Sequence, residues 1–193
     1  MRRVCVFCGS NSGDSRGFAE AARALGQALA LRGIELVYGG GNVGLMGEIA
    51  DAVLERGGRV IGVIPRALVD KELAHAGVQE MIVVATMHER KAKMAELSDA
   101  FVALPGGFGT LDELCEVLTW SQLGFHDKPC ALLDVEGYFR PLLELFDQAV
   151  ERGFLRAENR AALLEETEPE RLLERLATWR PVRREKWIGR GEL

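Results

Sequence analysis

Residues Ile34-Glu35-Leu36-Val37-Tyr38-Gly39-Gly40-Gly41-Asn42-Val43-Gly44 lead from a short apolar segment into a glycine-rich turn. A helical pattern over residues 45–56 follows directly. The segment 34–38 is close to a continuous apolar run, which is typical of a parallel strand that is buried on both faces. The stretch therefore predicts a strand, a glycine turn and a helix, which is the repeating unit of α/β folds.

The same order recurs on both sides of this stretch. Short apolar runs predict strands over residues 4–8, 34–38, 60–64, 81–84, 101–104 and 130–133. Between them, helical patterns predict helices near residues 18–32, 45–56, 87–98, 111–124 and 138–152. This alternation predicts a single-domain α/β fold, a Rossmann-like doubly wound parallel sheet with helices on both faces.

The end of the chain differs in composition from the rest. Residues 165–170 are acidic and contain Pro169, which predicts a turn, and residues 171–179 predict a short amphipathic helix. Residues 180–190 are basic and include Trp187. We therefore expect a domain over residues 1–180 and a basic C-terminal tail over residues 181–193, either solvated or docked on a neighbouring subunit, where Trp and Arg are enriched.

Composition limits the function classes that need to be considered. The chain has 193 residues, of which 48% are hydrophobic and 27% are charged, enough for one domain with its own core. Its apolar runs are far shorter than the roughly 20 residues of a membrane helix, and the N-terminal run is too short for a signal peptide. The net charge of −5 argues against nucleic acid or an anionic membrane as the main partner. We expect a cytoplasmic protein.

The cysteines do not predict a metal site. Cys5-x-x-Cys8 resembles half of a zinc site, but residues three apart on a strand point to opposite faces. No second pair with this spacing follows, and the histidines lack the HExxH spacing. We expect buried, inert thiols at the four cysteines, Cys5, Cys8, Cys115 and Cys130, and no bound metal.

Three of the predicted strand-to-helix turns are rich in glycine or serine: residues 9–13, 39–44 and 105–110. Glycine lets the backbone approach a ligand closely, and the helix that follows presents free N–H groups and the positive end of its dipole. In a parallel sheet these turns lie at the same edge. They predict a phosphate site, with Ser10, Gly40, Gly41 and Gly106 as the phosphate-loop candidates.

Two common nucleotide-binding classes do not fit these turns. Residues 39–44 match GxGxxG, but the strand that should then end in an acidic residue ends in Val63-Ile64-Pro65-Arg66. A dinucleotide dehydrogenase is therefore disfavoured. The GxxxxGK[ST] motif is absent from the sequence, which excludes a P-loop NTPase. Each turn alone is also explained as a tight connection, whereas three in one small domain favour nucleotide binding.

Glu113 has two interpretations. It closely follows the third glycine turn and shares a helix face with Glu116. The spacing Thr110-x-x-Glu113 is also that of a capping box, in which the glutamate binds a backbone amide at the start of the helix. From the pattern alone, a functional and a structural role are equally supported.

The segment Thr86-Met87-His88-Glu89-Arg90-Lys91 repeats this pattern, with Thr86-x-x-Glu89 as a second capping box. Arg90 and Lys91 then lie in the first turns of a helix, where the helix dipole disfavours cations. An anionic ligand facing them would explain their position. The alternative is that both side chains are simply solvated.

Together these segments resemble the Lonely Guy (LOG) family of cytokinin riboside 5′-monophosphate phosphoribohydrolases. The resemblance is carried by residues 7–10, 39–47, 87–91 and 105–113, with further agreement over residues 119–124 and 126–129. It extends from about residue 3 to residue 154. Phe108 and Asp112 are mild departures, since the family often has Tyr at the first position and a different acidic residue at the second.

The resemblance implies hydrolysis of the N-glycosidic bond of N6-substituted AMP, and of AMP itself, to free base and ribose 5-phosphate, without a cofactor. It implies that Arg90 and Glu113 are catalytic. It further implies substrate contacts by Glu72, Lys91, Gly107, Phe108, Gly109, Thr110, Leu111, Asp112 and Thr119. A general nucleoside-monophosphate nucleosidase and a non-catalytic nucleotide-binding module stay open as alternatives.

The resemblance also implies a homodimer, and Trp120, on a helix with more apolar residues than one buried stripe needs, is consistent with this. Relatives of this family are often labelled lysine decarboxylases. Pyridoxal phosphate chemistry needs a lysine that forms a Schiff base and a partner for the pyridinium nitrogen. No lysine of the chain lies in such a context: Lys71, Lys91, Lys93, Lys128 and Lys186.

Overall fold

A computed structural model describes residues 1–69 and 74–181 of the chain. Within them, seven strands form one sheet in the order β4-β3-β2-β1-β5-β6-β7, and all neighbouring strands are parallel. The strands are β1 Arg3–Phe7, β2 Glu35–Tyr38, β3 Val60–Pro65, β4 Glu80–Val84, β5 Ala100–Ala103, β6 Cys130–Leu133 and β7 Leu163–Glu166.

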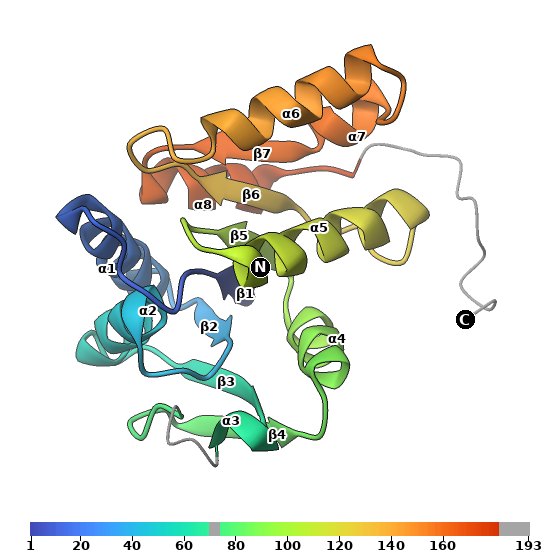
Figure 1. Cartoon of the computed structure of the whole chain (residues 1–193). Helices are drawn as coiled ribbons and strands as arrows, with labels where there is room; N and C mark the ends of the chain where they lie inside the picture. The colour runs from blue at the N-terminus through green and yellow to red at the C-terminus, as the bar shows by residue number, and fades with distance from the viewer. Residues whose placement is uncertain (70–73, 182–193) are drawn as a thin grey trace.

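Helices cover both faces of this sheet (Figure 1). They are α1 Arg16–Leu31, α2 Gly44–Glu55, α3 Arg66–Val69, α4 Met87–Leu97, α5 Phe108–Leu123, α6 Arg140–Glu151, α7 Ala157–Ala161 and α8 Pro169–Thr178. Apolar side chains of α1, α2 and α8 pack on one face, and those of α4, α5 and α6 pack on the other. The predicted doubly wound parallel α/β sheet is therefore confirmed.

The central strand β1 divides its side chains between the two faces of the sheet. Val4 and Val6, with Cys8 just after the strand, belong to the core under α1 and α2, whereas Cys5 and Phe7 belong to the core under α4 and α5. Cys5 and Cys8 thus lie on opposite faces, as expected, and burial raises the pKa of both thiols. This geometry rules out a shared metal between them.

Cys115 is a correction to the expectation that the cysteines are buried. Its side chain is exposed on α5, whereas Cys5, Cys8 and Cys130 are buried. The position follows from helix geometry, because Leu114 and Val117 already occupy the face of α5 that packs on the sheet. Position 115 therefore points away from that face.

The acidic turn expected over residues 165–170 is partly wrong, because Glu165 and Glu166 belong to strand β7. Glutamate is depleted in strands, so the pattern hid this edge strand. Two arginines form ion pairs with these glutamates. Arg160 Nη1 lies 2.7 Å from Glu165 Oε1, and Arg175 Nη1 lies 3.0 Å from Glu166 Oε1. The helix that follows, α8, begins at Pro169.

Two further features bear on the expected organisation. Among residues 1–69 and 74–181, no helix is both long and apolar enough to cross a membrane. Residues 182–193 lie outside the described residues, so the tail boundary near residue 181 and the docking of the tail stay predictions.

The strand order reverses its direction at β1. The chain passes from β1 outward to β4, then returns to β5 on the other side of β1 and continues outward to β7. In open α/β sheets, ligands bind in the crevice outside the carboxyl ends of the strands at such a switch point. The turns that follow β1, β2 and β5 lie at this edge of the sheet.

Candidate active site

The three glycine turns meet around one crevice at the carboxyl edge of the sheet. Gly9, which follows β1, connects the other two, because its N–H donates to Pro105 O at 3.0 Å and its carbonyl accepts from Leu45 N at 3.0 Å. Residues of all three turns line a cavity of about 540 Å³. The predicted convergence of the turns is therefore present.

Two of these glycines are required by the close approach of the turns. A Cβ at Gly106 would overlap the hydroxyl of Thr110 and lie 2.7 Å from Gly9 N. Gly44 has φ +54°, and a Cβ there would overlap the backbone of Ser10. Any larger residue at these positions would push the turns apart, so glycine is needed for the shape of the crevice.

Helices α2 and α5 begin at the crevice without side-chain caps. Their N-cap residues, Val43 and Gly107, make no capping hydrogen bond, whereas the Ser15 and Thr86 side chains cap α1 and α4. At the start of α5 the N–H groups of Phe108, Gly109 and Thr110 therefore stay available to a ligand, whereas in α2 Leu45 N already donates to Gly9 O. Helix N-termini that face one cavity are typical of anion-binding sites.

The structure decides between the two interpretations of Glu113. Helix α5 begins at Phe108 with Gly107 as its N-cap, so Thr110 lies inside the first turn and does not cap the helix. The capping-box interpretation of Thr110-x-x-Glu113 is therefore wrong. The second box is confirmed, because Glu89 N donates to Thr86 Oγ1 at 3.1 Å.

Glu113 instead forms a buried ion pair in the crevice. Arg90 Nη2 lies 3.1 Å from Glu113 Oε1, and the two side chains are only 12% and 9% exposed. Burial raises the pKa of Glu113, and the positive charge of Arg90 opposes that rise. The Nε of Arg90 has no hydrogen-bond partner among the described residues.

Gly39 makes room for this pair. A Cβ at Gly39 would overlap the guanidinium of Arg90, which lies across the end of β2. Gly39 is therefore needed because it leaves space for the Arg90 guanidinium, and not because its backbone angles require glycine. Arg90 and Glu113 both line the cavity.

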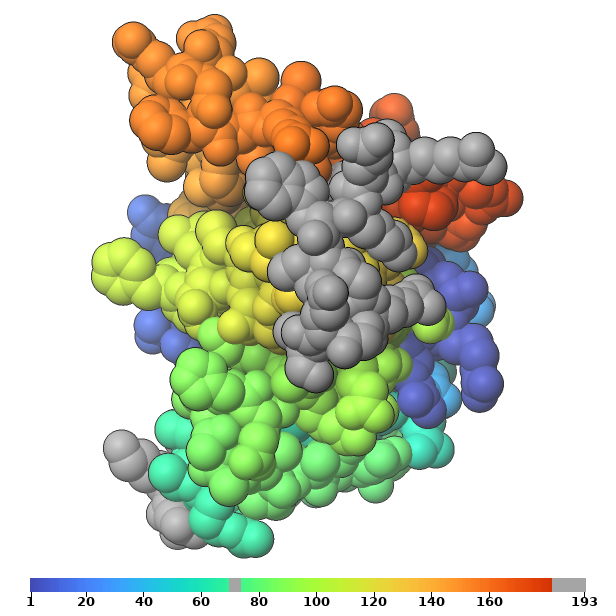
Figure 2. Space-filling model, turned by 90° about the vertical axis from the view of Figure 1, so that its right-hand side faces the viewer, coloured from blue at the N-terminus to red at the C-terminus, as the bar shows by residue number. Residues whose placement is uncertain are grey.

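Lys91 ties α4 to α5 beside the crevice. Its Nζ lies 3.0 Å from both Asp112 Oδ2 and Glu116 Oε1, and its side chain is 10% exposed. Figure 2 shows α4 and α5 next to each other on this face of the molecule. The anions that face Arg90 and Lys91 are thus carboxylates of α5, which holds the two helices in register.

The crevice brings together most of the residues that the sequence pointed to. Those that line it are Ser10, Gly41, Arg90, Gly106, Gly107, Phe108, Gly109, Thr110 and Glu113. Those that do not line it are Gly40, Lys91, Leu111, Asp112 and Thr119. Glu72 lies outside the described residues.

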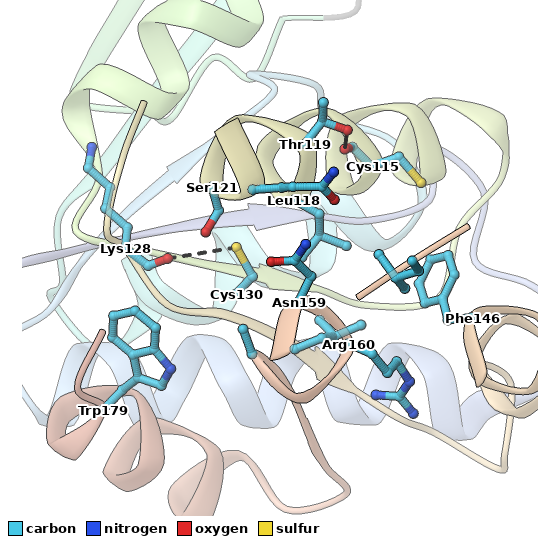
Figure 3. A pocket seen from close by; sticks show the side chains of 14 residues that line it. Cys115, Leu118, Thr119, Ser121, Lys128, Cys130, Phe146, Asn159, Arg160 and Trp179 are labelled. Atoms are coloured by element: carbon cyan, nitrogen blue, oxygen red, sulfur yellow. Dashed lines mark hydrogen bonds between the residues drawn. The ribbon is translucent and has the colours of Figure 1, made fainter. Parts of the chain in front are cut away.

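Thr119 lies at the other end of α5. Its hydroxyl donates to Cys115 O at 2.7 Å, and it lines a separate pocket of about 150 Å³ (Figure 3). Within one chain this position is remote from the glycine turns. The expected substrate contact of Thr119 therefore has no counterpart in the crevice of a single chain.

One wall of the crevice has no counterpart among the residues predicted from the sequence. Phe18, Met46, Ile64 and Tyr138 also line it, and they come from α1, α2, β3 and the connection before α6. The Tyr138 hydroxyl donates to Gly106 O at 2.6 Å. Tyr138 lies in the connection after β6, just as the glycine turns come after their strands. This position at the carboxyl end of a strand is the sequence signal that could have indicated that Tyr138 lines the crevice.

The fold and the crevice together define a class of protein. It is an α/β protein with a crevice at the switch point of a parallel sheet, where two helices begin without side-chain caps next to a buried carboxylate–guanidinium pair. A family model described as "possible lysine decarboxylase" matches residues 46–176.

Curated plant proteins identify the family more closely. A probable cytokinin riboside 5′-monophosphate phosphoribohydrolase of Oryza sativa subsp. japonica is 56% identical over 174 residues, which cover 90% of this chain and 78% of that protein. An Arabidopsis thaliana protein named as the same enzyme is 51% identical over 182 residues, covering 94% of this chain and 80% of that protein. The chain belongs to this family, the LOG family.

Solved structures share the fold. A molybdenum cofactor binding protein of Rippkaea orientalis matches with a TM-score of 0.69 and 22% identity, over 92% of this chain and 97% of that chain. The molybdenum cofactor carrier protein of Chlamydomonas reinhardtii matches with a TM-score of 0.69 and 23% identity, over 92% and 99% of the chains. At this identity the similarity concerns the architecture alone.

Proposed function

We propose that the protein hydrolyses the N-glycosidic bond of cytokinin riboside 5′-monophosphates, which are N6-substituted AMP molecules, and of AMP. The products are the free base and ribose 5-phosphate. The observation that carries this proposal is the buried Arg90–Glu113 pair beside two uncapped helix N-termini. The names of the curated relatives support it.

In this proposal the 5′-phosphate binds at the starts of α2 and α5. The N–H groups of Phe108, Gly109 and Thr110 have no side-chain cap and lie at the positive end of the α5 dipole. Ser10 and Gly41 line the same cavity. Binding the phosphate at this distance from the glycosidic bond fixes the position of the ribose relative to Glu113.

Glu113 acts at the anomeric carbon. Glycoside cleavage passes through a transition state with positive charge on the sugar ring. Water adds to C1′ while the C1′–N9 bond breaks, and the leaving base takes up a proton. The Glu113 carboxylate stabilises the developing positive charge or accepts the proton of the attacking water.

Arg90 sets the protonation state of Glu113. Burial alone raises the pKa of Glu113, and the charge of Arg90 lowers it. The ion pair with Arg90 therefore favours the ionised form of the Glu113 carboxylate, against the effect of burial. The remaining predicted contacts, which are Glu72, Lys91, Leu111, Asp112 and Thr119, stay predictions that rest on the family resemblance.

Lysine decarboxylation, which the description of the family model names, is disfavoured by the lysines that the structure describes. Lys93 pairs with Glu96 at 3.0 Å, and Lys128 donates to a backbone carbonyl at 2.7 Å. Lys91 is held by the carboxylates of α5. None of these three lines the crevice, so none is placed to form a Schiff base there.

We also propose a cytoplasmic homodimer. Phe108 and Met87, at the starts of α5 and α4, are 93% and 44% exposed. A two-fold contact is the commonest way to cover such apolar surface. Cys5 and Cys8 are free thiols, which is consistent with a reducing compartment. Sedimentation equilibrium that gives the monomer mass at micromolar protein would contradict the dimer.

The decisive experiment is chromatography of AMP, N6-isopentenyl-AMP and adenosine after incubation with the protein. We expect free base and ribose 5-phosphate from both monophosphates, and a much lower kcat/KM for adenosine, because remote phosphate binding contributes to turnover. Strong preference for unsubstituted AMP would favour a general nucleosidase. Tight binding without any product would favour a non-catalytic module.

A further inference from the structure

Tyr138 lies where the connection between β6 and α6 meets the crevice. The residue lines the cavity and is 43% exposed, and its hydroxyl donates to Gly106 O at 2.6 Å. The chemistry proposed for Glu113 and Arg90 does not use this hydroxyl. Its partner, however, belongs to the turn that leads into α5.

Packing fixes the position of the Tyr138 ring. It makes edge-to-face contacts with Phe18, at a centroid distance of 6.0 Å, and with Phe139, at 5.2 Å. Phe139 is itself buried, and its N–H donates to Asp134 Oδ1 at 2.9 Å. Contacts with two aromatic rings therefore hold the Tyr138 ring in place, in addition to the hydrogen bond from its hydroxyl to Gly106 O.

The Gly106 carbonyl controls the start of α5. In a trans peptide the C=O and the following N–H point in opposite directions, so holding the oxygen of Gly106 fixes the plane of the Gly106–Gly107 peptide. Gly107 is the N-cap of α5, with φ −88° and ψ −153°. A glycine has wide conformational freedom at this position, and without a side-chain cap this peptide needs an external constraint.

We propose that Tyr138 is a positioning residue for the phosphate end of the substrate. Its hydroxyl holds the Gly106–Gly107 peptide in the orientation that aims the free N–H groups of α5 at the anion. It also occupies a lone pair of a carbonyl that would otherwise repel a phosphate. The identity of the anion rests on the proposed function, whereas the positioning role rests on the geometry of the turn.

The test compares two Tyr→Phe variants. Y138F removes the hydroxyl and keeps the ring contacts. Y38F is the matched control, because Tyr38 is the only other tyrosine of the chain, is fully buried, and has a hydroxyl without a hydrogen-bond partner among the described residues. The readouts are the Kd of ribose 5-phosphate by calorimetry, kcat and KM for AMP and for adenosine, and the melting temperature.

We expect Y138F to raise the Kd of ribose 5-phosphate and the KM for AMP by roughly 3- to 10-fold, which is the effect of one hydrogen bond. The kcat for AMP should change less, the kcat/KM for adenosine should stay within about twofold, and the melting temperature should stay near that of Y38F. Y38F itself should match the parent protein in every binding and kinetic measurement.

Three outcomes would overturn the positioning role. They are an unchanged Kd of ribose 5-phosphate in Y138F, an equal loss of kcat/KM for AMP and adenosine, and no binding of ribose 5-phosphate by the parent protein at millimolar concentration. Failure of the proposed function has a different signature. In that case the parent protein would bind ribose 5-phosphate more tightly than Y138F but release no base from AMP.

Discussion

The two ends of helix α5 differ in how their polar groups are satisfied. At its start, Gly107 provides no side-chain cap, and Arg90 Nε has no hydrogen-bond partner among the described residues. At its end, Gly124 adopts φ 86°, and its N–H bonds back to Ser121 O and Trp120 O, which closes the helix. The start of α5 faces the large crevice, and the end faces the smaller pocket of Figure 3.

The smaller pocket is bordered by polar groups that already have partners. Arg160 pairs with Asp147 at 2.7 Å and with Glu165 at 2.7 Å. Lys128 donates to Ala95 O at 2.7 Å. Buried polar groups with complete hydrogen bonding stabilise a fold, whereas incompletely bonded ones in a cavity are available to a ligand. We therefore expect substitutions at the start of α5 to change activity and substitutions around its end to change stability.

Glu113→Gln should have the largest effect. The variant keeps the size of the side chain but removes the negative charge that faces the sugar ring. We expect kcat for AMP to fall by at least about 10²-fold, since a base or charge-stabilising role contributes about 10²–10⁴ in rate. Steady-state kinetics measures the loss, and calorimetry should show that AMP still binds.

Glu116→Gln is the control one turn further along α5. Glu116 pairs with Lys91 at 3.0 Å and does not line the crevice, so its loss should reduce kcat much less. If Glu113→Gln cleaves AMP at nearly the parental rate, the mechanism proposed for Glu113 is wrong.

Gly39→Ala should have the next largest effect. The added Cβ overlaps the Arg90 guanidinium and must displace it from Glu113. We expect kcat/KM for AMP to fall on the order of 10- to 100-fold, as small displacements of catalytic groups do. Gly33→Ala is the control: Gly33 has φ +64° and no atom within 4 Å of its Cβ position, so strain there should lower stability and leave kcat/KM unchanged.

Arg160→Ala tests the far end of α5. Its side chain is 16% exposed and joins α6 to β7 through Asp147 and Glu165. We expect the free energy of unfolding to fall by about 1–2 kcal/mol, with kcat/KM for AMP within about twofold of the parent. Arg175→Ala, at a side chain that is 45% exposed, should cost less in a urea titration. A large loss of activity in Arg160→Ala would contradict the expectation that residues at the end of α5 affect stability and not activity.

The pH dependence of activity should show a smaller but directional effect. Burial raises the pKa of Glu113 above its ordinary 4.5, and the carboxylate is the active form. The kcat/KM for AMP should therefore fall as pH decreases through a value above 4.5. In Gly39→Ala this limb should move to higher pH, because displacement of Arg90 removes the charge that lowers the pKa. An acid limb at or below 4.5 would contradict the assignment.

The same shift has a consequence for stability. A carboxyl group whose pKa is higher in the folded state binds a proton more tightly there than in the unfolded chain. Its contribution to stability is therefore lost as pH rises through the pKa of Glu113 in the folded protein. At neutral pH, Glu113→Gln should melt at the same temperature as the parent or higher, which a thermal scan measures.

Much of the sheet could be predicted because its strands carry their own signal. The run at residues 130–133 is apolar throughout and forms β6 with the expected bounds. Strand β7 could not be predicted, since its two glutamates are held by Arg160 and Arg175 from other elements. The intrinsic strand propensity of the residues predicts β6 well and β7 poorly, because β7 is stabilised by ion pairs with residues of other elements.

The sequence by itself determined the α/β alternation, the three glycine turns and the family, because period, glycine spacing and motif are local properties of the chain. Tertiary structure decided that Thr110 and Glu113 do not form a capping box. In the sequence, Thr110-x-x-Glu113 fits a helix capping box and a functional site equally well. The structure distinguishes these interpretations by the residue at which α5 begins and by Arg90, which pairs with Glu113 from helix α4. Electrostatic partners that are distant in sequence meet only after the sheet has set the positions of α4 and α5.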